Sequence, residues 1–183
     1  MLAPPRSTDS GAPHGRFEPG QLPVMDAGSN DSDNRDRAWI ATLRWYLPLI
    51  LTMNLIWEAA QLPLYTIWHE RSWLDLGVAV LHCVAGDGIV AAMALVAALV
   101  LAGSERWPAV GFARVALVTT AIGVTATIVI EWYSVEVGRR WAYAAAMPVL
   151  PILGTGLSPL AQWILLPTAG LAAARRLAKT GKP

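Results

Sequence analysis

Apolar positions along the chain gather into four long runs that are separated by short polar stretches. A helix needs about 20 predominantly apolar residues to cross a hydrocarbon core about 30 Å thick, and each run meets that length. We therefore predict an all-α polytopic membrane protein, built as a bundle of four transmembrane helices. The predicted spans are residues 45–68, 74–102, 112–135 and 157–177.

The fourth apolar run is too long for one crossing. Residues 142–174 carry no charged side chain, and a single helix of that length would reach about 50 Å. Residues 147–159 are dense in Pro and Gly, which interrupt helices. We predict a broken fourth segment: a short outer piece, a break near residues 154–158, and then the spanning helix. The break is either an interrupted helix that lines a binding site or a loop on the outer surface.

The two ends of the chain differ from the apolar runs. Residues 1–37 are rich in Pro, Gly, Ser, Asp and Asn and bury too little apolar surface to offset the entropy of ordering. We predict a disordered N-terminal tail over 1–37, a transmembrane domain over 38–178 and a basic C-terminal tail over 179–183. The tail lacks the apolar segment of a signal peptide, and Met25 within it is an alternative start.

Composition agrees with a membrane protein and excludes other classes. Apolar residues make up 55% of the chain and charged residues 15%, with a mean hydropathy of +0.43. A net charge of +1 provides no basic surface for nucleic acid, so the lipid bilayer is the expected surrounding. The single cysteine, Cys83, excludes an internal disulfide and a cysteine-based metal cluster.

The distribution of Lys and Arg predicts the orientation, because cytoplasmic loops carry the excess of positive charge. With four spans, both termini and the 103–111 loop share one side. We therefore predict a multi-pass protein of the cell (inner) membrane with both termini in the cytoplasm. That side carries Arg35, Arg37, Arg44, Arg106, Arg114, Arg175, Arg176, Lys179 and Lys182, and the other carries Arg71, Arg139 and Arg140.

The first span contains a stripe of polar residues. Asn54, Glu58, Gln61 and Tyr65 are spaced 4, 3 and 4 residues apart, which places them on one face of a helix. Such a face is expected to point into the bundle. Pro63 cannot donate a backbone hydrogen bond, so we predict a kink one turn beyond Glu58.

The other spans add polar residues at a similar depth. At 1.5 Å per residue, Glu58 lies about 20 Å along the first helix and His82 about 12 Å below the outer surface. Glu131 lies near the outer end of the third span, so these three residues share the outer half. His82 and Asp87 are five residues apart and point about 140° from each other. The remaining polar residues of these spans are Thr120, Thr127, Ser134, Thr155, Ser158 and Gln162.

The intramembrane charges are unbalanced, with Glu58, Asp87 and Glu131 facing one histidine, His82. A charged carboxylate at the bilayer centre costs at least about 2.5 kcal/mol. Three remedies remain open: protonation of the acids, pairing with His82 or with an arginine of the 139–140 pair, or ligation of a cation. Two carboxylates and an imidazole suit a divalent metal ion, so Glu58, His82 and Glu131 are candidate metal ligands.

Three functions fit these residues, beside a purely structural hydrogen-bond network. The first is an outward-facing acidic pocket that binds or moves a proton, a metal ion or a small polar solute. The second is an intramembrane enzyme, with or without a metal ion, on a lipid or isoprenoid substrate, with Glu58 and His82 as catalytic residues. The third is an accessory subunit of a homo-oligomer or larger membrane complex. The candidate substrate-binding residues are Asn54, Gln61, Tyr65, Asp87, Thr127, Arg139, Arg140 and Gln162.

Overall fold

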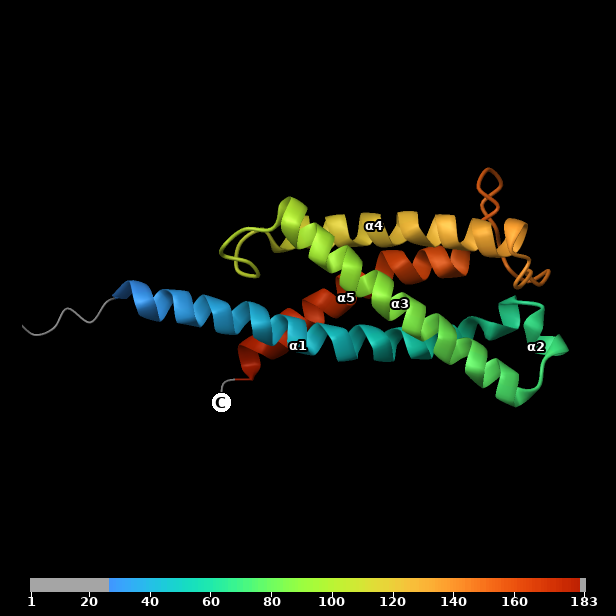
Figure 1. Cartoon of the computed structure of the whole chain (residues 1–183), viewed down its shortest axis with the longest axis horizontal. Helices are drawn as coiled ribbons and strands as arrows, with labels where there is room; N and C mark the ends of the chain where they lie inside the picture. Colours follow the sequence, from blue (N-terminus) through green and yellow to red (C-terminus); the bar gives the residue numbers. More distant parts are fainter. Residues whose placement is uncertain (1–26, 182–183) are drawn as a thin grey trace, which may run out of the picture.

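Four long helices run along the molecule in a computed structural model that describes residues 27–181 (Figure 1). They are α1 (Ala27–Gln61), α3 (Trp73–Ala102), α4 (Phe112–Trp132) and α5 (Leu157–Thr180). Each belongs to a segment that is long and apolar enough to cross a membrane. Across the described residues the regular elements are all helical, which confirms the predicted all-α fold of a multi-pass membrane protein.

The four helices form a ring in which each packs against two others. Helix α5 contacts α1 and α4, and α3 contacts the same two helices from the other side. Figure 1 shows α5 crossing from α4 toward α1. In the same view, α3 and α4 lie close together at the start of α4 and farther apart toward its C-terminal end. We call the end where α1 and α4 finish the loop end, and the opposite end, with the 103–111 connection, the termini end.

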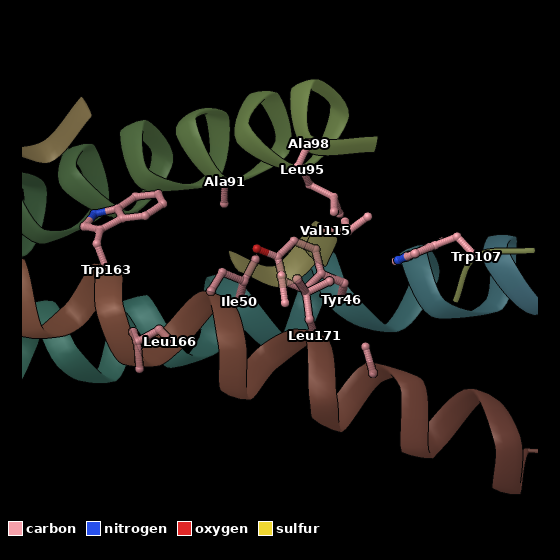
Figure 2. Packing of buried hydrophobic residues seen from close by; sticks show 12 residues of the cluster. Tyr46, Ile50, Ala91, Leu95, Ala98, Trp107, Val115, Trp163, Leu166 and Leu171 are labelled. Atoms are coloured by element: carbon pink, nitrogen blue, oxygen red, sulfur yellow. The ribbon is translucent and has the colours of Figure 1, made fainter. Parts of the chain in front are cut away.

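A buried apolar cluster joins all four helices (Figure 2). Tyr46 of α1, Leu95 of α3, Val115 of α4 and Leu171 of α5 each expose 2% or less of their surface. Many of the other contacts come from alanine, whose small side chain lets helix backbones approach closely. Figure 2 shows most of the labelled apolar residues to one side of Trp163, in the direction of Trp107 of the 103–111 connection.

The helix boundaries differ from the predictions mainly at the ends of the chain. Helix α1 begins at Ala27, so residues 27–37 of the predicted disordered tail continue the first helix. The rest of that tail, residues 1–26, lies outside the described residues. Helix α5 continues to Thr180 and so includes the start of the predicted C-terminal tail.

The first helix ends earlier than predicted. The apolar run predicted a helix to residue 68, but α1 stops at Gln61 and a 3-10 turn, η1 (Leu62–Leu64), follows. Pro63 lacks the N–H that an α-helix needs at this point, so it ends the helix instead of kinking it. Tyr65 is then extended and pairs with Tyr143, before the short helix α2 (Ile67–Glu70).

The predicted break in the fourth segment is a loop. Helix α4 ends in a π-helical turn, η2 (Tyr133–Val137), and residues 138–156 then form no helix. This loop folds back on itself, with Val149 paired to Gly156 and Gly154 at a φ of +63° that favours glycine. The predicted outer piece is therefore not an interrupted helix, and the spanning helix begins at Leu157 as predicted.

Candidate functional site

A hydrogen-bond network at the loop end converges on the side-chain amide of Gln162. Its Nε2 lies 2.8 Å from Asn54 Oδ1, 2.9 Å from Asp87 Oδ2 and 3.0 Å from Glu58 Oε1. Gln162 and Asn54 are each 2% exposed. One nitrogen of α5 therefore connects oxygen atoms from α1 and α3 inside the bundle.

Gln61 extends the network around Glu58. Its Nε2 donates to Glu58 Oε1 at 2.8 Å and lies 3.3 Å from Gln162 Oε1. The Oε1 atom of Gln61 accepts a 2.8 Å hydrogen bond from Ser158 Oγ. Ser158 Oγ in turn accepts a 3.3 Å hydrogen bond from Trp57 Nε1. The amides of Gln61 and Gln162 therefore both donate to the Glu58 carboxyl, and Ser158 contacts it only through Gln61.

The network contains more acceptors than donors. A primary amide nitrogen carries two hydrogens, whereas Gln162 Nε2 faces three acceptor oxygens. The Glu58 and Asp87 carboxyls lie close together, because both are within hydrogen-bond distance of this one nitrogen. A bond between two carboxyl groups requires a proton on one of them. A single shared proton would therefore supply the missing donor.

A second acidic group lies beside loop 138–156. Glu131 of α4 is 7% exposed and accepts a 2.5 Å hydrogen bond from the Tyr143 hydroxyl. The same hydroxyl accepts from the backbone N–H of Gly156 at 3.0 Å. Burial raises the pKa of Tyr143, and the hydrogen bond to Glu131 raises it further, so the phenol stays neutral and able to donate. Tyr143 thereby ties the loop to α4 and to the start of α5.

A cavity of about 250 Å³ lies between the two acidic groups. Glu58, Asp87 and Glu131 all line it, so it brings together acids from three helices. Apolar walls come from residues such as Val80, Val90 and Ile130. Its other polar lining includes Gln61, Tyr65, His82, Thr127, Arg140 and Gln162.

Most of the predicted site residues are brought to this cavity, and two are not on its wall. Asn54 lies behind Gln162 and reaches the site through that amide. Arg139 is exposed in loop 138–156, with a positive φ of 45°. Arg140 lines the cavity but places its guanidinium carbon 5.9 Å from the centre of the Tyr133 ring.

The two polar residues of α3, His82 and Asp87, point in different directions, as their spacing predicts. Asp87 points into the hydrogen-bond network, whereas His82 lines the same cavity from an exposed position. Within residues 27–181, no three His, Cys, Asp or Glu side chains come together as a group that could hold a metal ion. Glu58, His82 and Glu131 thus share a cavity without forming a ligand set.

Sequence reasoning missed Tyr143, Trp141 and Trp163 as parts of the site. Tyr143 and Trp141 lie beyond the third predicted span, and helix periodicity says nothing about a loop. The available signal was the high density of aromatic residues after Glu131. Trp163 lines the cavity because Gly123 leaves room for its ring, which would lie 2.1 Å from a Cβ added there.

Comparison of the chain with protein-family models, with curated proteins and with solved structures gives no match. The chemistry of the site is therefore the basis for a functional conclusion.

Proposed function

We propose that this chain is a cell (inner) membrane protein whose intramembrane cavity binds or moves a small polar species. Glu58 and Asp87 form its proton-binding pair. The observation that carries the proposal is the convergence of three acceptor oxygens on one Gln162 nitrogen, which has two hydrogens to donate. A proton on the carboxyl pair completes the hydrogen bonding.

The surroundings of the pair favour a single negative charge over two. A second carboxylate at membrane depth would add at least about 2.5 kcal/mol, and the two charges would repel each other. The amide nitrogens of Gln61 and Gln162 both donate toward Glu58 and stabilise the single negative charge that the pair keeps. A donor-bearing ligand in the adjacent cavity can therefore take over the role of the proton.

The proposed orientation places this cavity in the outer half of the membrane. Nine Lys and Arg residues on the side of the termini, against three on the other side, favour cytoplasmic termini. The cavity lies next to loop 138–156, at the end of the bundle remote from the 103–111 connection. Exchange with the outer aqueous phase then passes this loop.

The proposal is tested by infrared spectroscopy of the full-length protein in lipid bilayers. At neutral pH we expect the carbonyl band of a protonated carboxylic acid, and we expect Glu58→Gln and Asp87→Asn each to shift or remove it. Glu105→Gln, in the exposed 103–111 connection, is the control and should leave the band unchanged. A folded wild-type protein without such a band would contradict the proposal, because both acids would then be ionised.

An intramembrane enzyme is a second candidate, because Glu58 and His82 line one cavity that also has apolar walls. In that case Glu58 and His82 would serve as acid–base groups for a lipid or isoprenoid substrate. Incubation with a membrane lipid extract, followed by mass spectrometry, tests for turnover. Product that forms with the wild type and not with His82→Gln would favour the enzyme over a binding protein.

A further inference from the structure

The cavity is closed on one side and open on another. Gln61, Gln162 and Trp163 form a buried wall from α1 and α5. On the opposite side the lining residues His82 and Gly86 of α3 are exposed, and Ile130 of α4 is 46% exposed. Figure 1 shows α3 and α4 lying farther apart toward the loop end than toward the termini end. Because both helices belong to apolar spans, this opening faces the acyl chains of the bilayer.

The wall of the cavity is suited to a cation. Its three acids, Glu58, Asp87 and Glu131, outnumber the basic groups, and its amide nitrogens already have acceptors. The basic side chains, His82 and Arg140, are both exposed at its margin. Tyr65 and Cys83 are the other ionisable groups on the wall.

Aromatic rings add to the attraction for a cation. Tyr65, Trp141 and Trp163 all line the cavity. Tyr65 meets Trp141 edge to face, at 6.4 Å between ring centres, so the two rings present different surfaces to the same space. Ammonium groups bind favourably against the faces of such rings, most strongly when water is excluded.

The volume limits the part of a ligand that fits inside. A volume of about 250 Å³ lies at the small end of ligand pockets, which span about 300–1,000 Å³. A head group and a few carbon atoms fill that space, and a longer chain has to leave through the opening between α3 and α4. Val80, Val90 and Ile130 provide apolar contacts along that path.

We infer that the cavity binds a lipophilic amine, a single-chain amphiphile whose ammonium head lies between the acids and whose chain extends sideways into the bilayer. The inference rests on the proposed function, because the ammonium takes the place of the proton shared by Glu58 and Asp87. Binding therefore releases that proton from the carboxyl oxygen to water or buffer, and no other covalent bond changes. The N–H groups of a primary ammonium supply the donors that the three acceptors around Gln162 lack.

The test compares three probes of equal chain length: decylamine, decanol and decanoate. Each is titrated calorimetrically into full-length protein in nanodiscs of zwitterionic lipid, with empty nanodiscs as the blank. We expect saturable binding of decylamine at least about tenfold tighter than that of decanol, with decanoate weaker still. The observed binding enthalpy should vary with the ionisation enthalpy of the buffer, because a proton is released on binding.

Two pairs of variants locate the site and the path. Glu58→Gln should weaken decylamine binding at least about tenfold, and Glu105→Gln should leave it unchanged. Gly86→Leu places a side chain in the opening, where an added Cβ meets nothing within 4 Å, so the helix tolerates it. It should weaken or slow binding, whereas Gly77→Leu, which is equally open but outside the cavity lining, should not.

The outcomes separate this inference from the proposed function. Decanol or decanoate binding as tightly as decylamine overturns the cationic ligand, and so does decylamine binding that Glu58→Gln leaves unchanged. Decylamine binding unaltered by Gly86→Leu overturns entry from the bilayer. A protonated-carboxyl band without saturable decylamine binding overturns the inference alone. Absence of the band overturns the proposed proton-binding pair.

Discussion

Glu58 and Gln162 lie 104 residues apart in the chain and are joined by a 3.0 Å hydrogen bond between Glu58 Oε1 and Gln162 Nε2. The bond links α1 to α5 inside the loop-end half of the bundle. Because the same nitrogen also faces Asn54 and Asp87, this one amide connects α1, α3 and α5 and contacts both acids.

Replacement of Gln162 by leucine should destabilise the bundle. The change removes the donor shared by three acceptors, and a buried acceptor without a partner costs about 1–3 kcal/mol. We expect a loss of about 2–4 kcal/mol, measured by unfolding in mixed micelles. The control is Thr120→Val, which removes the 3.1 Å bond between Thr120 and Thr168, where the expected loss is below about 1 kcal/mol. Equal losses of unfolding free energy in the two variants would show that the Gln162 network stabilises the bundle no more than one exposed hydrogen bond does.

Wild-type stability should fall as pH rises above neutrality. In the proposed function the native state holds a proton between Glu58 and Asp87, whereas both carboxyls are ionised in the unfolded chain near neutral pH. The native state therefore binds more protons, and by linkage its stability decreases with increasing pH. Asp87→Asn keeps a donor at this position without a titratable proton, so the slope should flatten. Unfolding between pH 6 and about pH 9 measures this, and parallel slopes for the two proteins would rule out the shared proton.

Gly123→Ala should destabilise the packing of α4 against α5. A Cβ at this position would lie 2.1 Å from Cε3 of Trp163, whose ring is 4% exposed and has little room to move. Overpacking of this kind costs about 1–3 kcal/mol. Gly77→Ala is the matched control, because its Cβ meets nothing within 4 Å and alanine favours the helix by about 0.5–1 kcal/mol. The unfolding midpoint should fall for the first variant and hold or rise for the second.

Tyr143→Phe should loosen loop 138–156. The substitution removes the hydrogen bonds of the hydroxyl to Glu131 and to Gly156, so hydrogen exchange of the loop should accelerate. Tyr133→Phe keeps the ring beside Arg140 and is the control, with exchange close to wild type.

The pH dependence of that effect has a definite sign. The folded-state pKa of Tyr143 is raised above the ordinary value of about 10. Its contribution to stability is therefore complete below about pH 10 and is lost as pH rises through the folded-state pKa. We expect the difference in hydrogen exchange between Tyr143→Phe and wild type to be the same at neutral pH and at pH 9. A difference that is present at neutral pH and absent at pH 9 would contradict the prediction.

The polar face of the first helix could be read from the sequence because periodicity is a local property. The spacing of Asn54, Glu58 and Gln61 predicts one inward face, and these residues do share the buried network. The same reasoning failed for Tyr65, which reaches the cavity through a turn and an extended residue after Pro63 ended the helix. A proline shows where a helix is disturbed, but the surrounding packing decides whether it bends or stops.

Contacts between distant segments could not be obtained in this way. The counted depths place Glu58, His82 and Glu131 at one level, but depth leaves the rotation of each helix undetermined. Asp87 instead of His82 joins Glu58, because the rotation of α3 directs its carboxyl toward Gln162. Tyr143 meets Glu131 only through the path of a loop that has no periodic signal.

The sequence by itself determined four apolar spans, their approximate ends and the presence of acids at membrane depth, since length, hydropathy and helical period depend on neighbouring residues alone. The tertiary structure decided which oxygens meet at Gln162, that loop 138–156 is tied down by Tyr143, and that acids from three helices line one cavity. These features depend on helix rotation and crossing. Side-chain packing across the whole bundle sets both, through small residues such as Gly123 and large ones such as Trp163.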